Sequence, residues 1–297
     1  MPPVRTSLRS VRLSATVALL AALFTSATAL AGPPFQTDDP DPVAFRHFEM
    51  YAFTLSDGTT SGGTTLSAPA YEVNYGVVPS VQLHLVVPLT AVFIPDGGPT
   101  NYGIGDTELG VKLRFIKESK HTPQIGIFPF FEFPSGNADR GLGVGKTWYR
   151  MPLWLQKSWG PEERQWTTYG GGGEAIVPQD GYKNWPFAGW LVQRQLNKKI
   201  TLGVELFGHG AEGEAATSTR ASTMLDLGGI YEFKDGFDLL FAAGRSVYGQ
   251  PETYTYLSLY WTWGPKDAAD AGDKDKDKPD SGKASKMLSA LTKFRPR

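Results

Sequence analysis

Between about residues 44 and 263, hydrophobic and polar side chains alternate with a period of two, in repeated segments of roughly a dozen residues. In residues 107–115, aliphatic and aromatic side chains at the odd positions from 109 onward alternate with Glu108, Lys112 and Arg114. Residues 81–89, 200–209 and 256–263 show the same pattern. Because successive side chains of a strand point to opposite faces, each segment predicts a β-strand with one apolar and one polar face.

The segments number about twelve, and the connections between them alternate in length. Their centres lie near residues 50, 71, 85, 110, 129, 153, 170, 192, 205, 228, 242 and 258. Short connections fall at 78–80, 160–163, 197–199 and 234–236, and long ones rich in Gly, Pro, Asp and Asn at 56–64, 94–104, 135–146, 177–186 and 210–220. Short turns at one rim and long loops at the other are typical of an outer-membrane barrel. Because the break at 117–123 is longer than the other short connections, ten and fourteen strands remain alternatives to twelve.

The polarity of the two faces distinguishes a membrane barrel from a soluble one. One face is almost entirely apolar, and aromatic side chains gather at the strand ends, as in the girdles of membrane barrels. A soluble barrel would instead bury its apolar face. We therefore predict an all-β fold over residues 44–264, a transmembrane antiparallel up-and-down β-barrel; the alternative is a soluble β-sandwich. The candidates to line its lumen are Glu49, Glu72, His84, Glu108, Lys112, Arg114, Glu132, Arg150, Glu174, Glu205 and Asp226.

Both ends of the chain depart from the strand pattern. Residues 1–31 combine three arginines, a short apolar run and an Ala-Leu-Ala site, which predicts a secretory signal peptide. Residues 32–43 are extended and rich in Pro and Asp; one hypothesis is that they fold into the periplasmic mouth as a partial plug, through Phe35, Asp38, Asp39 and Asp41. Residues 265–297 are highly charged and predict a disordered tail, ending in a short amphipathic helix or a frayed end.

The composition argues against several classes of protein. The 297 residues include no cysteine, which excludes disulfides and thiol chemistry. The net charge of −1 argues against a nucleic-acid partner. A mean hydropathy of −0.25, with no apolar run long enough for a spanning helix after the signal peptide, argues against a helical membrane protein.

No motif in the chain supports catalysis or a bound cofactor. The four histidines lack a metal-ligand spacing, and none forms a local pair with a serine, so we predict no enzyme and no metal or cofactor site. Residues 145–147 end like a phosphate-binding loop but lack its first glycine. The inward charges can be interpreted in two ways. They form either a polar pathway that filters solutes or a mutually paired network that fills a narrow barrel.

Parts of the sequence resemble a known family. The stretch 32–42 leading into Phe48–Tyr51, together with 103–112, 202–207 and 256–263, is similar to proteobacterial outer-membrane proteins linked to meta-pathway phenol degradation, many described only as transporters. The resemblance implies a monomeric or weakly oligomeric barrel that passes small hydrophobic or aromatic compounds. The charged tail departs from a barrel that ends on its last strand.

Taken together, the sequence predicts a protein of the bacterial outer membrane that gives passive or facilitated passage to a small, hydrophobic or aromatic compound. One alternative is a non-conducting barrel that anchors or scaffolds through its tail, and another is a lipid-modifying barrel enzyme. The expected partners are outer-membrane lipid, the barrel-assembly machinery, a small-molecule solute and a periplasmic partner of the tail.

Overall fold

The structure is a computed structural model that describes residues 33–59, 63–93, 100–213 and 220–265. The signal peptide predicted over residues 1–31 lies outside the described residues, and so does the tail after residue 265. Two short 3-10 helices, η2 (Ala138–Arg140) and η3 (Glu162–Arg164), interrupt the loops. In the described part of the chain, no helix is both long and apolar enough to cross a membrane.

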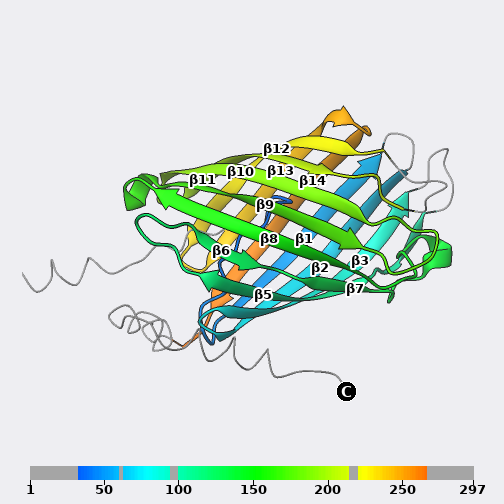
Figure 1. Ribbon diagram of the computed structural model, residues 1–297. Coiled ribbons are helices and arrows are strands. Elements are labelled where there is room, and N and C mark those ends of the chain that lie inside the picture. The colour runs from blue at the N-terminus through cyan, green and yellow to red at the C-terminus, as the bar shows by residue number, and fades with distance from the viewer. Residues whose placement is uncertain (1–32, 60–62, 94–99, 214–219, 266–297) are drawn as a thin grey trace, which may run out of the picture. The chain divides into compact units, whose positions relative to one another are not determined.

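The described chain is a single antiparallel sheet of strands that runs around a barrel (Figure 1). The strands are β1 (Phe48–Thr59), β2 (Gly63–Val78), β3 (Val81–Phe93), β4 (Asn101–Ile104), β5 (Thr107–Ile116), β6 (Gln124–Ile127), β7 (Phe130–Phe133), β8 (Trp148–Trp159), β9 (Trp166–Ile176), β10 (Trp185–Asn197), β11 (Ile200–His209), β12 (Ser222–Lys234), β13 (Phe237–Gly249) and β14 (Glu252–Trp263).

Pairing of the first strand with the last closes the barrel. Strand β1 pairs along its length with β14 on one side and with β2 on the other. Strands β4 and β5 both pair with β3, and β6 and β7 both pair with β5 and β8, so each of these two couples is one interrupted barrel strand. The result is a closed barrel of 12 antiparallel strands, as the sequence predicts.

The alternation located the strands well and their ends less well. Eleven of the predicted centres fall inside strands, and the twelfth, near residue 129, falls in the break between β6 and β7. Three short turns, after β2, β10 and β12, lie where they were expected. The last contains Gly236 with φ of +69°, a left-handed conformation that favours glycine in a tight hairpin. Three predicted loops, 56–64, 94–104 and 177–186, were too long, because each overlaps the end of a strand: β1 runs to Thr59 and β2 begins at Gly63, β4 covers Asn101–Ile104, and β10 begins at Trp185.

The polarity of the barrel wall is inverted relative to a soluble protein. On the outer face, Leu83, Val204 and Leu227 are 48%, 45% and 58% exposed, whereas the inward Glu205 and Asp226 are 0% exposed. Apolar side chains left on the outside are stable only when another apolar phase covers them. The barrel wall therefore has the surface of a membrane-spanning barrel.

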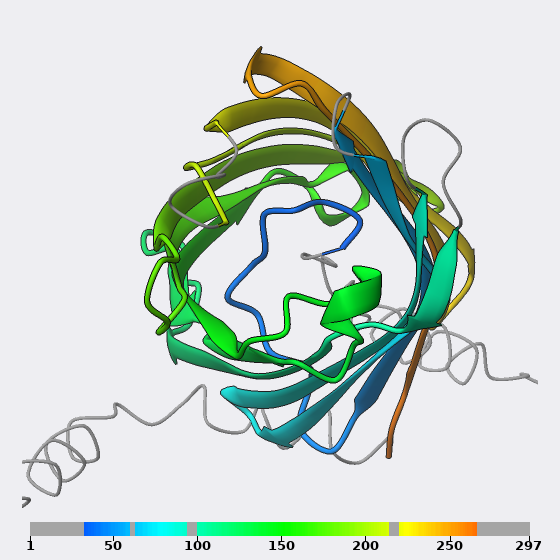
Figure 2. The same ribbon diagram turned by 90° about the vertical axis from the view of Figure 1, so that its right-hand side faces the viewer.

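The N-terminal segment, residues 33–43, lies inside the ring of strands. Figure 2 shows it as a blue trace that crosses the interior. The buried side chains of Phe35, Thr37 and Asp39 belong to this segment. Since its backbone has no strand partner, its polar groups must find partners on the inner wall, which is where the candidate site lies.

Candidate functional site

Two carboxylates at the centre of the barrel hold the start of the N-terminal segment. Glu205 on β11 and Asp226 on β12 face each other across the two strands. Glu205 accepts hydrogen bonds from the backbone N–H groups of Gln36 at 3.0 Å and Thr37 at 2.5 Å. The side-chain amide of Gln36 donates to Asp226 at 3.0 Å. Donors of the segment thus bind both carboxylates, although Asp226 Oδ1 is buried without a hydrogen-bond partner.

Two cations on β5 hold the rest of the segment. Lys112 Nζ lies 3.0 Å from Asp38 and 3.3 Å from Asp39, and Arg114 pairs with Asp41. Burial raises the pKa of Asp39 well above its usual range, while the Lys112 ammonium opposes that shift. Burial also raises the pKa of Asp41, with Arg114 acting against it. These pairs fix the acidic half of the segment to one side of the wall.

Inward-facing glycines make room for the segment. A Cβ on Gly189 would collide with the side chain of Thr37, and one on Gly203 would lie 2.9 Å from the ring of Phe35. The hydroxyl of Tyr254 donates to the carbonyl of Pro34 at 2.8 Å and ties the segment to β14. The four residues proposed for the plug, Phe35, Asp38, Asp39 and Asp41, all lie against the inner wall. The glycines were a signal for the position of Phe35 that the sequence analysis did not use.

A second group of predicted lumen residues forms its own network. His84 lies 2.7 Å from Glu108 through Nε2 and 2.8 Å from Asn74 through Nδ1. Asn74 in turn donates to Glu72 at 2.8 Å. Glu49 accepts a hydrogen bond from Tyr260 at 2.9 Å. The contacts in this group match a mutually paired network, the second of the two interpretations of the inward charges.

Aromatic side chains form one inner wall, which the sequence analysis did not anticipate. A buried cluster draws on β8, β10 and β11, and its rings pack at centroid distances near 6 Å, for example 6.0 Å between Trp148 and Trp185 and 6.2 Å between Trp154 and Phe187. Arg150 points at this wall, and Glu132 lies opposite Trp148 on the neighbouring strand. The lumen therefore offers an aromatic surface beside a charged one.

One predicted lumen residue faces the other way. Glu174 is exposed and lies opposite Met151 and Pro186, which are exposed as well, so its side chain is on the outer face. The prediction for Glu174 is wrong because it follows four glycines, Gly170 to Gly173, which give no side-chain pattern from which to count faces. The other ten candidates lie on the inner face.

Three residues at the long-loop rim have the ligand types of a metal site. Ligand atoms of His209, Glu212 and Glu252 lie within 4.8 Å of one another. A direct hydrogen bond of 3.0 Å between His209 Nε2 and Glu252 already uses two of these atoms. We therefore assign the group no metal.

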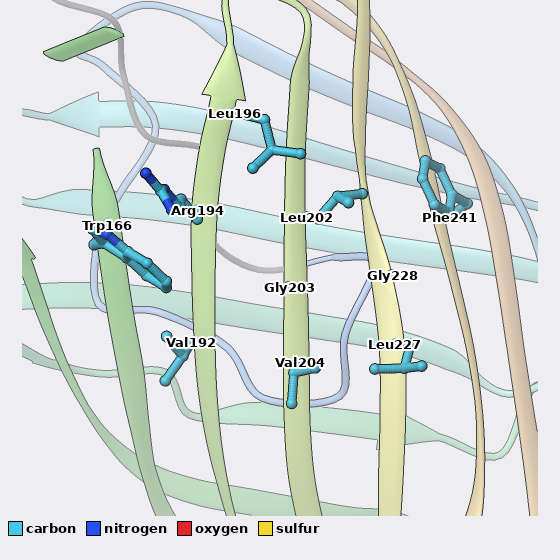
Figure 3. Close-up of a pocket in the computed structure, with 10 residues that line it drawn as sticks. All are labelled: Trp166, Val192, Arg194, Leu196, Leu202, Gly203, Val204, Leu227, Gly228 and Phe241. Atoms are coloured by element: carbon cyan, nitrogen blue, oxygen red, sulfur yellow. The ribbon is translucent and has the colours of Figure 1, made fainter. Parts of the chain in front are cut away.

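An apolar groove of about 580 Å³ lies on the outer face, not in the lumen (Figure 3). Exposed aliphatic side chains of β10, β11 and β12 line it, with Arg194 and Trp166 at one end. The Arg194 guanidinium stacks on the Trp166 ring at 4.9 Å. Its apolar lining continues the lipid-facing surface, so it does not enlarge the candidate site.

Comparison with known proteins gives a match at the level of structure. No family model matches the sequence, and no curated protein is similar to it in sequence. An outer membrane channel from Pseudomonas putida F1 superposes with a TM-score of 0.60 at 15% identity, covering 76% of this chain and 98% of the channel. The fold is that of an outer-membrane β-barrel.

A weaker likeness adds no argument. The translocator domain of autotransporter NalP from Neisseria meningitidis has a TM-score of 0.48 at 11% identity, over 74% of this chain and 89% of that domain. At such identities the similarity is one of fold alone, so the function must be argued from the residues of the lumen.

Proposed function

We propose that this protein lies in the bacterial outer membrane and gives passive or facilitated passage to a small, hydrophobic or aromatic compound. The observation that carries the proposal is the aromatic inner wall of a closed barrel whose outer face is aliphatic. The similarity in fold to a protein described as an outer membrane channel supports it. So does the resemblance of the N-terminal stretch to outer-membrane proteins linked to phenol degradation.

The composition of the inner wall explains which solutes such a barrel would favour. Flat aromatic faces attract apolar and aromatic solutes through dispersion and offset stacking, at about 0.5–1.5 kcal/mol for each aromatic pair beyond area burial. Paired charges of β3 and β5 occupy another part of the wall, and the N-terminal segment lies against β5, β10, β11 and β14. A solute would therefore move along the part of the aromatic wall that the segment does not cover.

The N-terminal segment would act as a plug that controls this path. It crosses the interior and is held at several points, by Glu205, Lys112 and Tyr254 among others. Each hydrogen bond to a charged group contributes about 1.5–3 kcal/mol, so the segment stays docked at rest. A solute would pass either after the N-terminal segment shifts or through the space beside the segment.

Uptake by whole cells tests the proposal, because an intact outer membrane slows the entry of apolar solutes. The initial uptake rate of a labelled monoaromatic compound would be compared in cells with and without the full protein. We expect several-fold faster uptake with the protein, and little change for a sugar of similar mass as control. Equal rates for the aromatic compound in both strains would contradict the proposal.

The second candidate is a non-conducting barrel that serves as a scaffold. The dense pairing between the N-terminal segment and the inner wall favours it, because a filled lumen needs no solute. Conductance across planar bilayers separates the two: a scaffold conducts neither as the full protein nor after removal of residues 33–43. A channel conducts more after that removal.

A further inference from the structure

Arg150 is surrounded by aromatic rings. Its guanidinium lies 5.1–5.4 Å from the ring centres of Phe130, Trp148, Trp185 and Phe187. Its Nε is buried without a hydrogen-bond acceptor, and among the described residues no carboxylate forms an ion pair with it. Cation–π contacts stabilise the charge, but they do not supply the Nε–H group with an acceptor.

A second donor in the same wall lacks an acceptor. The indole Nε1 of Trp154 is buried without a hydrogen-bond partner, whereas the side chain of Trp148 interacts with the carboxylate of Glu132. An indole and a guanidinium can only donate, so Arg150 and Trp154 cannot satisfy each other. A buried donor left unpaired costs about 1–3 kcal/mol, and most buried polar groups in proteins are paired. Two unpaired donors in one aromatic wall point to an acceptor that comes from outside the chain.

Glu132 and Glu108 are the nearby acidic residues. Glu132 lies opposite Trp148 on the adjacent strand and interacts with its side chain, and it acts on Arg150 electrostatically without forming an ion pair. Glu108, opposite Glu132, is bound to His84. The site thus combines a fork of N–H donors with flat apolar faces, and the negative charge of Glu132 lies at its edge. A fork of this kind matches a carboxylate, which accepts two parallel hydrogen bonds from a guanidinium.

We propose that Arg150 binds the carboxylate of a monoaromatic acid, whose ring packs against Trp185 and Phe187. The biological role of this site rests on the proposed function, because the site would select aromatic anions among the solutes that pass through the barrel. Binding itself does not depend on passage. Strand β8 carries Arg150 close to the loop at residues 134–147, so the site faces the long-loop mouth of the lumen.

Binding would be measured by calorimetry on the purified full-length protein in detergent, with benzoate as the probe at neutral pH. Acetate, which lacks the ring, and benzyl alcohol, which lacks the charge, are the matched comparison ligands. We expect benzoate to bind at least about tenfold more tightly than either, since one charged hydrogen bond or one stacked ring changes affinity by about that factor.

Substitutions then assign the binding to this site. Arg150→Gln should weaken benzoate binding at least about tenfold and leave benzyl alcohol nearly unchanged. Glu132→Gln removes a competing charge and should strengthen benzoate binding. If Arg150→Gln fails to fold, Arg150→Lys keeps the charge, and it should still weaken binding because an ammonium lacks the planar fork.

Arg194→Gln is the matched control. Arg194 also stacks on a tryptophan and has a buried Nε without an acceptor, but it lies on the outer face (Figure 3). Benzoate affinity that is unchanged in Arg194→Gln and reduced in Arg150→Gln supports the site. Equal binding of benzoate and acetate, or no effect of Arg150→Gln, overturns it. Benzoate binding at Arg150 without any aromatic uptake by cells would keep the site and contradict the proposed function.

Discussion

The carboxylate of Glu205, in the middle of β11, accepts a 2.5 Å hydrogen bond from the backbone N–H of Thr37, 168 positions earlier in the chain. Both residues are fully buried. A contact between such distant positions means that the N-terminal segment belongs to the packed interior of the barrel. The behaviour of the lumen therefore depends on how firmly this segment is held.

Removal of the Glu205 side chain should loosen the segment. Glu205→Ala leaves the N–H groups of Gln36 and Thr37 without their acceptor, at a cost of about 1.5–3 kcal/mol. Hydrogen exchange at these two amides, followed by mass spectrometry, should accelerate roughly 10- to 100-fold. Glu174→Ala, which changes the same residue type on the outer face, is the control. Unchanged exchange in Glu205→Ala would show that the docking depends on other contacts.

Loss of Lys112 should expose the cost of two buried carboxylates. Lys112→Met leaves Asp38 and Asp39 without their cation, and breaking such a buried pair costs about 3–5 kcal/mol. We expect the segment to become sensitive to proteases in detergent while the barrel stays intact. Adding Asp38→Asn and Asp39→Asn should restore much of the protection. A triple variant as sensitive as Lys112→Met would rule out charge as the cause.

A side chain at Gly189 should displace the segment by overlap. The added methyl group of Gly189→Ala would collide with Thr37, and overpacking of this kind costs about 1–3 kcal/mol. Single-channel recordings should show more frequent or longer openings than in the wild type. Gly208→Ala, on the outer face of the next strand, tests for a general effect of adding a methyl group. If the two variants behave alike, the segment does not control the openings.

The outer face should respond to charge according to depth in the membrane. Val204→Arg places a cation near the middle of β11, where it costs about 2–4 kcal/mol of barrel stability in lipid. Val78→Arg, at the end of β2 beside a short turn, should cost only about 0–1 kcal/mol. Unfolding by denaturant in lipid vesicles measures both. An equal loss of stability in the two variants would mean that Val204 does not lie deeper in the bilayer than Val78.

The strands could be predicted because the lipid-facing side repeats one property. In β11, every second residue from Leu202 to Leu206 is aliphatic and exposed, and the intervening Glu205 is buried. A period-two contrast of this strength locates a strand and assigns its faces. The same contrast placed His84, Lys112 and Asp226 on the inner side.

Features without such contrast were missed or misplaced. In β10, Trp185 and Phe187 point inward, but the outward Pro186 and Ala188 that follow them are not polar, so the sequence showed no alternation there. The N-terminal segment has no period at all. Its partners are set by charge and by the glycines of the wall, and Lys112 lies 74 and 73 positions from Asp38 and Asp39. Only the folded chain brings these groups together.

A disulfide between the segment and the wall tests the central claim most directly. The chain has no cysteine of its own, and a Cβ on Gly189 would lie 3.2 Å from that of Thr37, close to the separation that a disulfide spans. Single-channel conductance of the Thr37→Cys, Gly189→Cys variant should be low when oxidised and rise when a reductant is added. Conductance that is the same in both states, or absent in both, would contradict a lumen whose passage is controlled by the N-terminal segment.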